Sequence, residues 1–421
     1  MPNPIQQIFK VGDLRRKLLF TFLMLLVFRI GAHVAVPGID PAAMQDLLSG
    51  QLFSFFDIIS GGAFKRFSIF AMSITPYINA TIIMQLLTVI IPRLEELQKE
   101  GEEGKKVIAK YTRYGTVVLA LLQSVGMCLA LGKAGAIITP NFFAYIVIAV
   151  SLTAGTIILM WFGEMITERG IGNGISLIIF AGIVSRLPSD IAGIGPQLSA
   201  GIIGAVNIIA LVVIALLIIA VVVAMNEGQR RIPIQYAKRM VGRRMYGGQS
   251  SFLPLRVNAA GVIPIIFAMS LMMFPATIGS FMDPTGGYNS FINNYFNPGS
   301  VAYNVLYGLL IVFFAYFYVA IIFNPVDVAE NIKRNGGFIP GIRPGRPTAE
   351  HIDKILSRLT MAGGIFLALI AVLPNFVIAF TGVQGLQFGG TSLLIVVGVA
   401  LDTMKQIESH LILRSYEGFV K

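Results

Sequence analysis

The sequence has little charge, one cysteine and few histidines. Charged residues make up 13% of the 421 residues, about half of the roughly 25% found in an average soluble domain. The single cysteine, Cys128, excludes a disulfide within the chain and a cysteine-based metal site. The three histidines, His33, His351 and His410, lie too far apart for a metal-binding motif. We therefore expect no metal and no cofactor, and a mean hydropathy of +0.77 indicates that the lipid bilayer is the main solvent of the chain.

The motifs of nucleotide-driven and catalytic proteins are also lacking. No GxxxxGK[ST] motif occurs, so the chain has no P-loop with which to hydrolyse ATP. The segment Gly170–Gly174 resembles a dinucleotide-binding loop only weakly, because no strand precedes it and its third glycine is misplaced; a turn that starts a helix explains it better. No arrangement of serine, histidine and aspartate suggests hydrolysis. We expect no enzymatic activity.

Long apolar runs are what the sequence does contain. A transmembrane helix needs about 20 largely apolar residues, and nine runs approach or reach that length. They cover residues 18–36, 68–91, 112–132, 141–162, 199–224, 258–280, 303–323, 358–382 and 389–404. A tenth run, 174–187, also fits a short helix of a soluble protein, but its apolar neighbours favour a short span surrounded by protein. The N-terminal run follows basic residues, as in a signal peptide, but no small-residue cleavage site follows it, so we expect a retained first span.

The distribution of lysine and arginine predicts the orientation of these spans, because such residues concentrate in cytoplasmic loops. With the N-terminus in the cytoplasm, most of the 32 lysines and arginines fall in cytoplasmic segments. The outer segments then contain only Lys65, Arg66, Lys133 and Arg186. The pattern predicts ten spans with both termini in the cytoplasm.

Two cytoplasmic loops, 226–257 and 325–354, contain more arginine than orientation requires. Proline and glycine in both loops favour ordered turns, so we expect the cations to project from hairpins. A basic protruding loop suits a polyanionic or acidic partner, such as ribosomal RNA or the acidic surface of a motor protein. Attraction to anionic lipid is an equal alternative.

Ionisable residues within the spans are scarce, the nearest cases being Arg29, Glu164 and Asp402. Carriers that couple transport to protons or ions usually place such groups at the membrane midplane. The pattern therefore counts against a secondary solute carrier, which would move a small solute without a motor protein, and an intramembrane enzyme is a more distant class still.

The second apolar run has an unusual start. Pro76 either begins the helix or kinks it, and residues 57–67 (DIISGGAFKRF) are too short and too polar to span. Such a re-entrant or capping element must be buried in protein or line water. Ile74 and Ile78 are four residues apart and share a helix face; simple packing is the plainer explanation for this pair.

A series of segments in order along the chain forms a familiar pattern. They are Phe28–Gly31, Val36–Asp40, Pro76–Ala80, Arg169–Gly174, Gln229–Pro233, Gly261–Pro264, Gly341–Gly345 and Gly389–Ile395. With the spans between them, these segments resemble the SecY family, the central subunits of the bacterial Sec translocon. The resemblance covers essentially the whole chain.

The resemblance implies an all-α membrane protein with ten transmembrane helices in two pseudo-symmetric five-helix halves, residues 1–195 and 196–421, hinged near Leu187–Gly201. It also implies an hourglass pore pinched by a ring of apolar residues, which excludes water and ions and binds a passing peptide only weakly. The ring positions are Ile74, Ile78, Ile179, Ile266 and Ile395.

Two further elements of the pore follow from the resemblance. A plug helix is expected to occlude the outer funnel, formed by Asp57, Ile58, Ile59, Ser60, Gly61, Gly62, Ala63, Phe64, Lys65, Arg66 and Phe67. A lateral gate is expected between spans two and three on one side and seven and eight on the other, with Gln85 and Asn258 as its polar residues. Such contacts are weak enough for an apolar signal peptide to displace them.

The implied function is conduction of unfolded secretory polypeptides across the bacterial plasma (inner) membrane, with release of transmembrane segments sideways into lipid. The driving force is expected from the SecA ATPase or the ribosome, docked through Arg243, Arg244 and Arg343. SecE and SecG subunits are expected to complete the complex.

Overall fold

The computed structural model describes residues 11–40, 60–133, 135–199, 204–236, 239–241, 244–246, 250–279, 286–296, 300–381 and 390–417. Most of these residues are helical. The first group of helices comes from the N-terminal half of the chain. It comprises α2 (Gly12–Gly31), α5 (Thr75–Ile90), α6 (Pro92–Lys99), α7 (Glu102–Lys133), α8 (Phe142–Arg169), α9 (Gly174–Ala192) and α10 (Ile194–Ser199).

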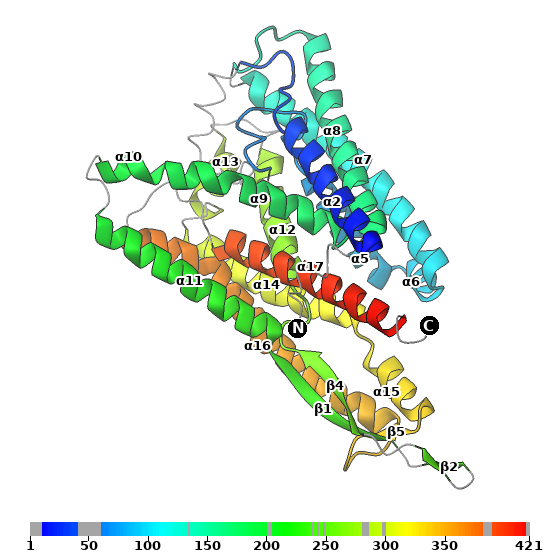
Figure 1. Ribbon diagram of the computed structural model, residues 1–421. Coiled ribbons are helices and arrows are strands. Elements are labelled where there is room, and N and C mark those ends of the chain that lie inside the picture. The colour runs from blue at the N-terminus through cyan, green and yellow to red at the C-terminus, as the bar shows by residue number, and fades with distance from the viewer. Residues whose placement is uncertain are drawn as a thin grey trace.

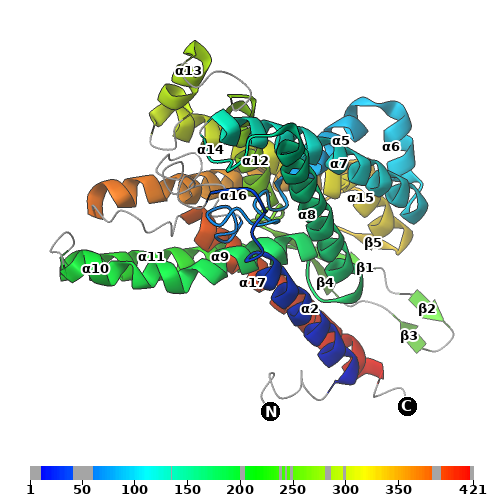
Figure 2. The ribbon, with the colours of Figure 1, turned by 90° about the horizontal axis from the view of Figure 1, so that it is seen from above.

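The second group of helices follows the first in the chain. It comprises α11 (Ala205–Glu227), α12 (Ile263–Gly279), α13 (Gly287–Tyr295), α14 (Val301–Ile322), α15 (Pro325–Arg334), α16 (Arg346–Thr381) and α17 (Gly390–Glu417). In Figure 1, α2, α5, α7 and α8 occupy the upper part of the view, and α11, α14, α16 and α17 the lower part. The first residues of α2 and the last of α17 lie at the same end of the molecule (Figures 1 and 2).

A helix lies over each of the apolar runs of the sequence. Among the described residues, five helices are long and apolar enough to cross a membrane, or six if α5 and α6, which meet at 100°, count as one broken span. Two shorter apolar helices, Gly174–Ser189 and Ile263–Gly279, add to these. Both α2 and α17 carry several charged residues along their length. The chain is therefore a multi-pass membrane protein.

Several predicted boundaries are wrong. The first helix ends at Gly31, not at residue 36, because the chain then runs extended and Val36 N–H donates to the Phe67 carbonyl at 2.9 Å. The second helix begins at Thr75, not at residue 68, because the preceding residues form turns. Pro76 lies in the first turn of α5, where proline is favoured, so it starts the helix and does not kink it. The helix over the predicted run 358–382 begins twelve residues earlier than predicted, because α16 starts at Arg346, outside the apolar run.

A small β-sheet joins the two basic loops. Strands β1 (Gln229–Tyr236) and β4 (Ser250–Arg256) form an antiparallel hairpin, and β5 (Gly337–Phe338) from the second loop pairs with the free edge of β1. Strands β2 (Arg239–Val241) and β3 (Arg244–Tyr246) form a separate two-stranded ribbon. The hairpin predicted in the first loop is confirmed, but its pairing with the second loop was not expected. We call the sheet, α15 and the start of α16 the basic-loop unit; it projects from one end of the helices (Figure 1).

The chain between α2 and α5 packs closely against helices at glycine positions, where the helix has no side chain. A Cβ at Gly31 of α2 would collide with the Phe70 ring, and one at Gly155 of α8 would collide with the Ile69 carbonyl. Ile69 N–H in turn donates to the Val34 carbonyl at 3.0 Å. These glycines let the segment approach the helix backbones closely, so its position is fixed by packing on both sides.

This packing predicts that Gly155→Ala is destabilising whereas Gly115→Ala is not. The added methyl at Gly155 meets backbone that cannot move aside, and overpacking of this kind costs about 1–3 kcal/mol. At Gly115, in α7, the nearest atom to a new Cβ is 3.6 Å away, which is ordinary contact. The midpoint of thermal unfolding of the purified protein should fall for Gly155→Ala only; equal midpoints for both variants contradict the tight fit.

Candidate pore and the segment packed against it

The five predicted ring residues belong to one continuous hydrophobic cluster. They come from the start of α5 (Ile74 and Ile78), from α9 (Ile179), from α12 (Ile266) and from α17 (Ile395), and are 0–8% exposed. We call them the isoleucine cluster. Both groups of helices contribute to it, so the cluster lies where the two groups meet.

Local sequence signals place these side chains. The residue before α5 is an N-cap without a side-chain hydrogen bond, and Ile78 N–H donates to the Ile74 carbonyl at 3.0 Å, so the two isoleucines occupy the first turn. Helix α9 begins at Asn173, whose side chain accepts a hydrogen bond from Ser176 N–H. Helix α12 begins only after a turn in which Gly261 has a positive φ of 64°.

The described part of the predicted plug, Ser60–Phe67, divides between two hydrophobic clusters: Ala63 belongs to the core that contains the isoleucines, and Phe64 and Phe67 belong to a second cluster with Ile148 and Leu152. Asp57, Ile58 and Ile59 lie outside the described residues. Residues 60–67 form turns and not the expected helix, because Gly61, Gly62 and Phe67 have positive φ values of 66°, 84° and 42°. Ala63 is fully buried and belongs to the hydrophobic cluster that contains the isoleucines.

Two contacts fix the base of this segment. Arg29 Nη1, near the end of α2, donates a hydrogen bond to the Gly61 carbonyl at 3.0 Å. On the other side, a Cβ at Gly61 would lie 2.7 Å from the Gly182 Cα in α9. The segment therefore bridges α2 and α9 through its own backbone.

The predicted lateral gate corresponds to an observed contact between the two groups. Helix α12 packs against α5 and α7 of the first group, and against α14 of its own. Gln85 lies in α5, and its buried side-chain Oε1 accepts no hydrogen bond. Asn258 precedes α12 and donates to Asn226 Oδ1 at 2.8 Å, within the second group. The described residues contain no hydrogen bond between Gln85 and Asn258.

The two groups also meet at α9 and α17. Gly172 N–H donates to Gln406 Oε1 at 2.8 Å across this contact. A cavity of about 370 Å³ lies beside it, lined by the start of α9, the turn before α12 and the polar residues Asp402 and Gln406 of α17. The seam between the groups is thus polar and hollow near the starts of α9 and α12, and apolar at the isoleucine cluster.

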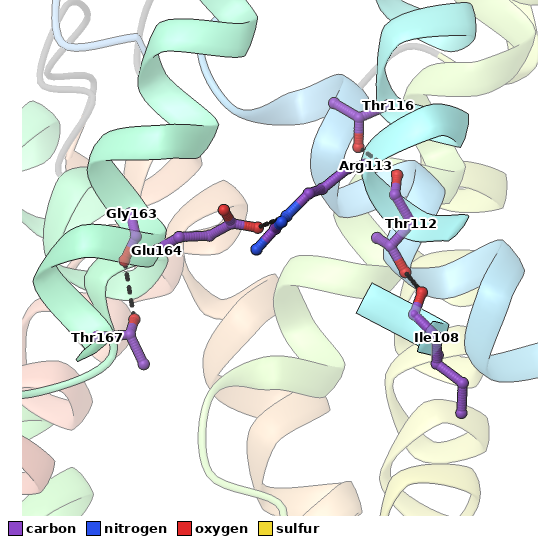
Figure 3. Close-up of polar contacts among 7 residues, drawn as sticks. All are labelled: Ile108, Thr112, Arg113, Thr116, Gly163, Glu164 and Thr167. Carbon is purple, nitrogen blue, oxygen red and sulfur yellow. Dashed lines mark hydrogen bonds and ion pairs between the residues drawn. The ribbon is translucent and has the colours of Figure 1, made fainter. Parts of the chain in front are cut away.

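The three ionisable residues noted within the apolar runs have different surroundings. Arg29 binds the Gly61 carbonyl and Asp402 lines the cavity. Glu164 of α8 pairs with Arg113 of α7, with Nε and Oε1 2.7 Å apart, and Figure 3 shows the two side chains extended toward each other between the helices. The sequence shows that Glu164 is an ionisable residue in an apolar run, but it does not identify Arg113, 51 residues away, as its partner.

The basic-loop unit has a hydrophobic core of its own. Ile232, Ile234 and Leu255 of the hairpin pack with Ile332, Ile339 and Ile352 of the second loop. Arg343 is exposed in the turn before α16, and its carbonyl accepts a hydrogen bond from Thr348 Oγ1 at 2.9 Å. Arg244 begins β3 and pairs with Val241 of β2, whereas Arg243 lies outside the described residues. The β1–β4 hairpin of the first loop therefore packs with the second loop, whereas Arg244 lies in the separate β2–β3 ribbon.

Helices long enough to span a membrane, with an aliphatic core to which both groups of them contribute, define a multi-pass membrane protein. Comparison with known families is consistent with this class. Residues 68–404 match the SecY family model. The chain belongs to the SecY family.

Curated relatives are similar over their full length. The chain is 48% identical to the protein translocase subunit SecY of Streptomyces coelicolor, covering 98% of each chain. It is 49% identical to that of Halalkalibacterium halodurans, covering all of both, and 48% identical to that of Escherichia coli K12, covering 98% of this chain and 95% of the relative.

Solved structures share the fold. A structure of a protein-conducting channel matches with a TM-score of 0.68 at 19% identity, covering 94% of this chain and 92% of the other. Sec61 in a canine ribosome–channel complex matches with a TM-score of 0.64 at 18% identity, with the same coverage.

The Arg113–Glu164 contact predicts a measurable coupling between α7 and α8. The side chains are 47% and 21% exposed, so a double-mutant cycle with Arg113→Ala and Glu164→Ala should give about 1 kcal/mol in the free energy of unfolding. Arg346 and Glu350, 90% and 67% exposed, form the control pair, and their coupling should be near zero. A coupling for Arg113 and Glu164 no larger than that of the control contradicts a structural role for the pair.

Proposed function

We propose that this chain is the channel subunit of a bacterial protein translocase, and that unfolded secretory polypeptides pass through it at the isoleucine cluster. The observation that carries the proposal is that the five isoleucines, contributed by both groups of helices, are buried in one hydrophobic core that also contains Ala63 of the 60–67 segment. Membership of the SecY family and 48% identity to protein translocase subunits support it.

The chemistry of the isoleucine cluster suits a conduit. A narrow collar of branched aliphatic side chains excludes water and ions by dewetting, because it offers them no hydrogen bonds. The same side chains offer a passing polypeptide only dispersion contacts of about 0.1–0.2 kcal/mol per atom pair. A chain of almost any sequence can therefore slide without stalling, while the resting channel stays closed to ions.

The 60–67 segment acts as the plug of this channel, within the longer segment 57–67. Its close approach to Gly182 of α9 and the burial of Ala63, Phe64 and Phe67 support a closed resting position. The segment must leave this position before a polypeptide passes, and these three side chains must then repack.

Sideways release requires the two groups of helices to separate. We assign the gate to the contact of α12 with α5 and α7, with residues 1–195 and 196–421 as the two halves of a ten-span bundle joined through α10. Among the described residues, the buried Gln85 Oε1 in α5 has no hydrogen-bond donor, which supports a closed gate that is not held by hydrogen bonds at this position. A signal peptide that enters as an apolar helix would occupy this contact and face lipid on its outer side.

The membrane is the bacterial inner membrane, and both termini and the basic-loop unit face the cytoplasm. The concentration of lysine and arginine on that side supports this orientation. SecA or the ribosome docks on the two basic loops through Arg243, Arg244 and Arg343 and supplies the driving force. SecE and SecG brace the two halves from the lipid side.

The isoleucine cluster is tested by Ile78→Ser, Ile179→Ser and Ile266→Ser combined. Serine hydroxyls wet the collar, so the resting ion conductance of the complex in planar bilayers should rise by at least about tenfold. The control carries Val212→Ser, Val213→Ser and Leu216→Ser on the exposed face of α11 and should conduct as the unmodified complex does. Unchanged conductance in the cluster variant rules out these residues as the seal.

Docking is tested by Arg343→Ala. An exposed arginine on a rigid turn contributes a charge-assisted contact, so binding of SecA to the complex should weaken about tenfold, and the loss should shrink at high salt. Arg346→Ala, three residues further on at the start of α16 and paired with Glu350 at 3.1 Å, should lose less. Equal losses for the two variants would mean that only the overall charge of the unit matters.

A further inference from the structure

Arg29 is a cation in a helix that is otherwise apolar around it. It lies next to Phe28 and Ile30, two residues before α2 ends. A charged side chain in such a position is costly and needs a partner. Among the described residues no carboxylate forms an ion pair with Arg29. Its Nη1 instead donates a hydrogen bond to the Gly61 carbonyl at 3.0 Å.

The Gly61 carbonyl is available because the chain turns there in a conformation that favours glycine. Gly61 and Gly62 both have positive φ values, 66° and 84°. The Gly61 Cα faces Gly182 of α9 so closely that any side chain would meet backbone atoms at 2.7 and 2.8 Å. The turn is thus pressed against α9 on one side and held by a single cationic donor on the other.

We propose that Arg29 is a latch that holds the 60–67 segment in its closed position and releases it when the channel opens. The inference rests on the proposed function for what the latch closes, but the contact itself is a property of the structure. Two residues after Gly61, Ala63 is buried in the same hydrophobic cluster as the isoleucines. Holding Gly61 therefore keeps the segment against the pore.

The latch is suited to release because its partner is neutral. A hydrogen bond from a cation to a carbonyl is stronger than one between neutral groups, but it leaves the charge of Arg29 uncompensated. Arg66, of like charge, acts electrostatically on Arg29 in the closed state. When the segment leaves and water enters, the guanidinium regains hydration, which offsets the lost bond. A carboxylate partner would hold more tightly and would leave a second buried charge on release.

The latch is tested by the rate at which a thiol at Ala63 reacts. Full-length chain with its partner subunits is placed in vesicles in a Cys128→Ala background, which removes the only native cysteine, and Ala63→Cys is added. A membrane-impermeant, positively charged methanethiosulfonate is supplied from the outer side without motor or precursor. Arg29→Leu should speed labelling by at least about tenfold, the loss of one charge-assisted hydrogen bond, and Arg29→Lys should lie between Arg29→Leu and the unmodified chain.

Arg16→Leu is the matched control, because it removes another cation of α2 that is exposed, and its labelling should stay at the original rate. Gly61→Ala is the second variant, for use if Arg29→Leu does not assemble: the methyl pushes the turn off α9 and should also speed labelling. If Arg29→Leu, or Gly61→Ala in its place, labels no faster than Arg16→Leu, the latch is wrong. Ion conductance of the same vesicles separates the two proposals. Faster labelling without conductance supports the latch but contradicts the closing role assigned to the segment.

Discussion

Five isoleucine side chains from α5, α9, α12 and α17 are buried in one hydrophobic core to which both groups of helices contribute. A contact of this kind is held by exclusion of water and by dispersion, without directional bonds. It can therefore part and close again without leaving polar groups unpaired. The placement of the polar contacts is consistent with a core that excludes water and helices around it that can separate.

The polar interactions are accordingly placed away from the cluster. Gly172 and Gln406 join the two groups on one side of it, whereas Asn258 binds Asn226 within a single group. Glu164 and Arg113 tie α7 to α8, two helices of the same group (Figure 3). Glu164–Arg113 and Asn258–Asn226 thus join helices within one group, whereas Gly172–Gln406 joins the two groups. The movement proposed for the seam between α5 and α12 would leave the contacts within each group intact.

Much of the helical architecture could be predicted from the sequence, because uninterrupted apolar runs in a bilayer leave helices as the only economical backbone structure. The ends of those helices could not. The first helix ends at Gly31 because Val34 and Val36 pair with residues 67–69, and a pairing over that distance leaves no local signal. The joining of the basic loops through β5 escaped prediction for the same reason.

The candidate site divides in a similar way. The resemblance to a known family supplied the positions of the isoleucines, and the structure groups all five in one buried cluster. The plug was expected to be helical, yet Gly61, Gly62 and Phe67 adopt positive φ values that break a helix. Neither the close approach of this segment to Gly182 nor its contact with Arg29 has a sequence pattern, because a glycine that makes room for backbone looks like any other glycine.

The most direct measurement of the account is the position of a polypeptide caught in transit. A secretory precursor can be stalled by a tightly folded C-terminal domain while a photoreactive probe is attached to a cysteine at Ile179, or at Val213 on the exposed face of α11. The account predicts crosslinks to the precursor from Ile179 and none from Val213. Crosslinks from Val213 without any from Ile179 would place the polypeptide in lipid beside the helices and contradict passage between the two halves.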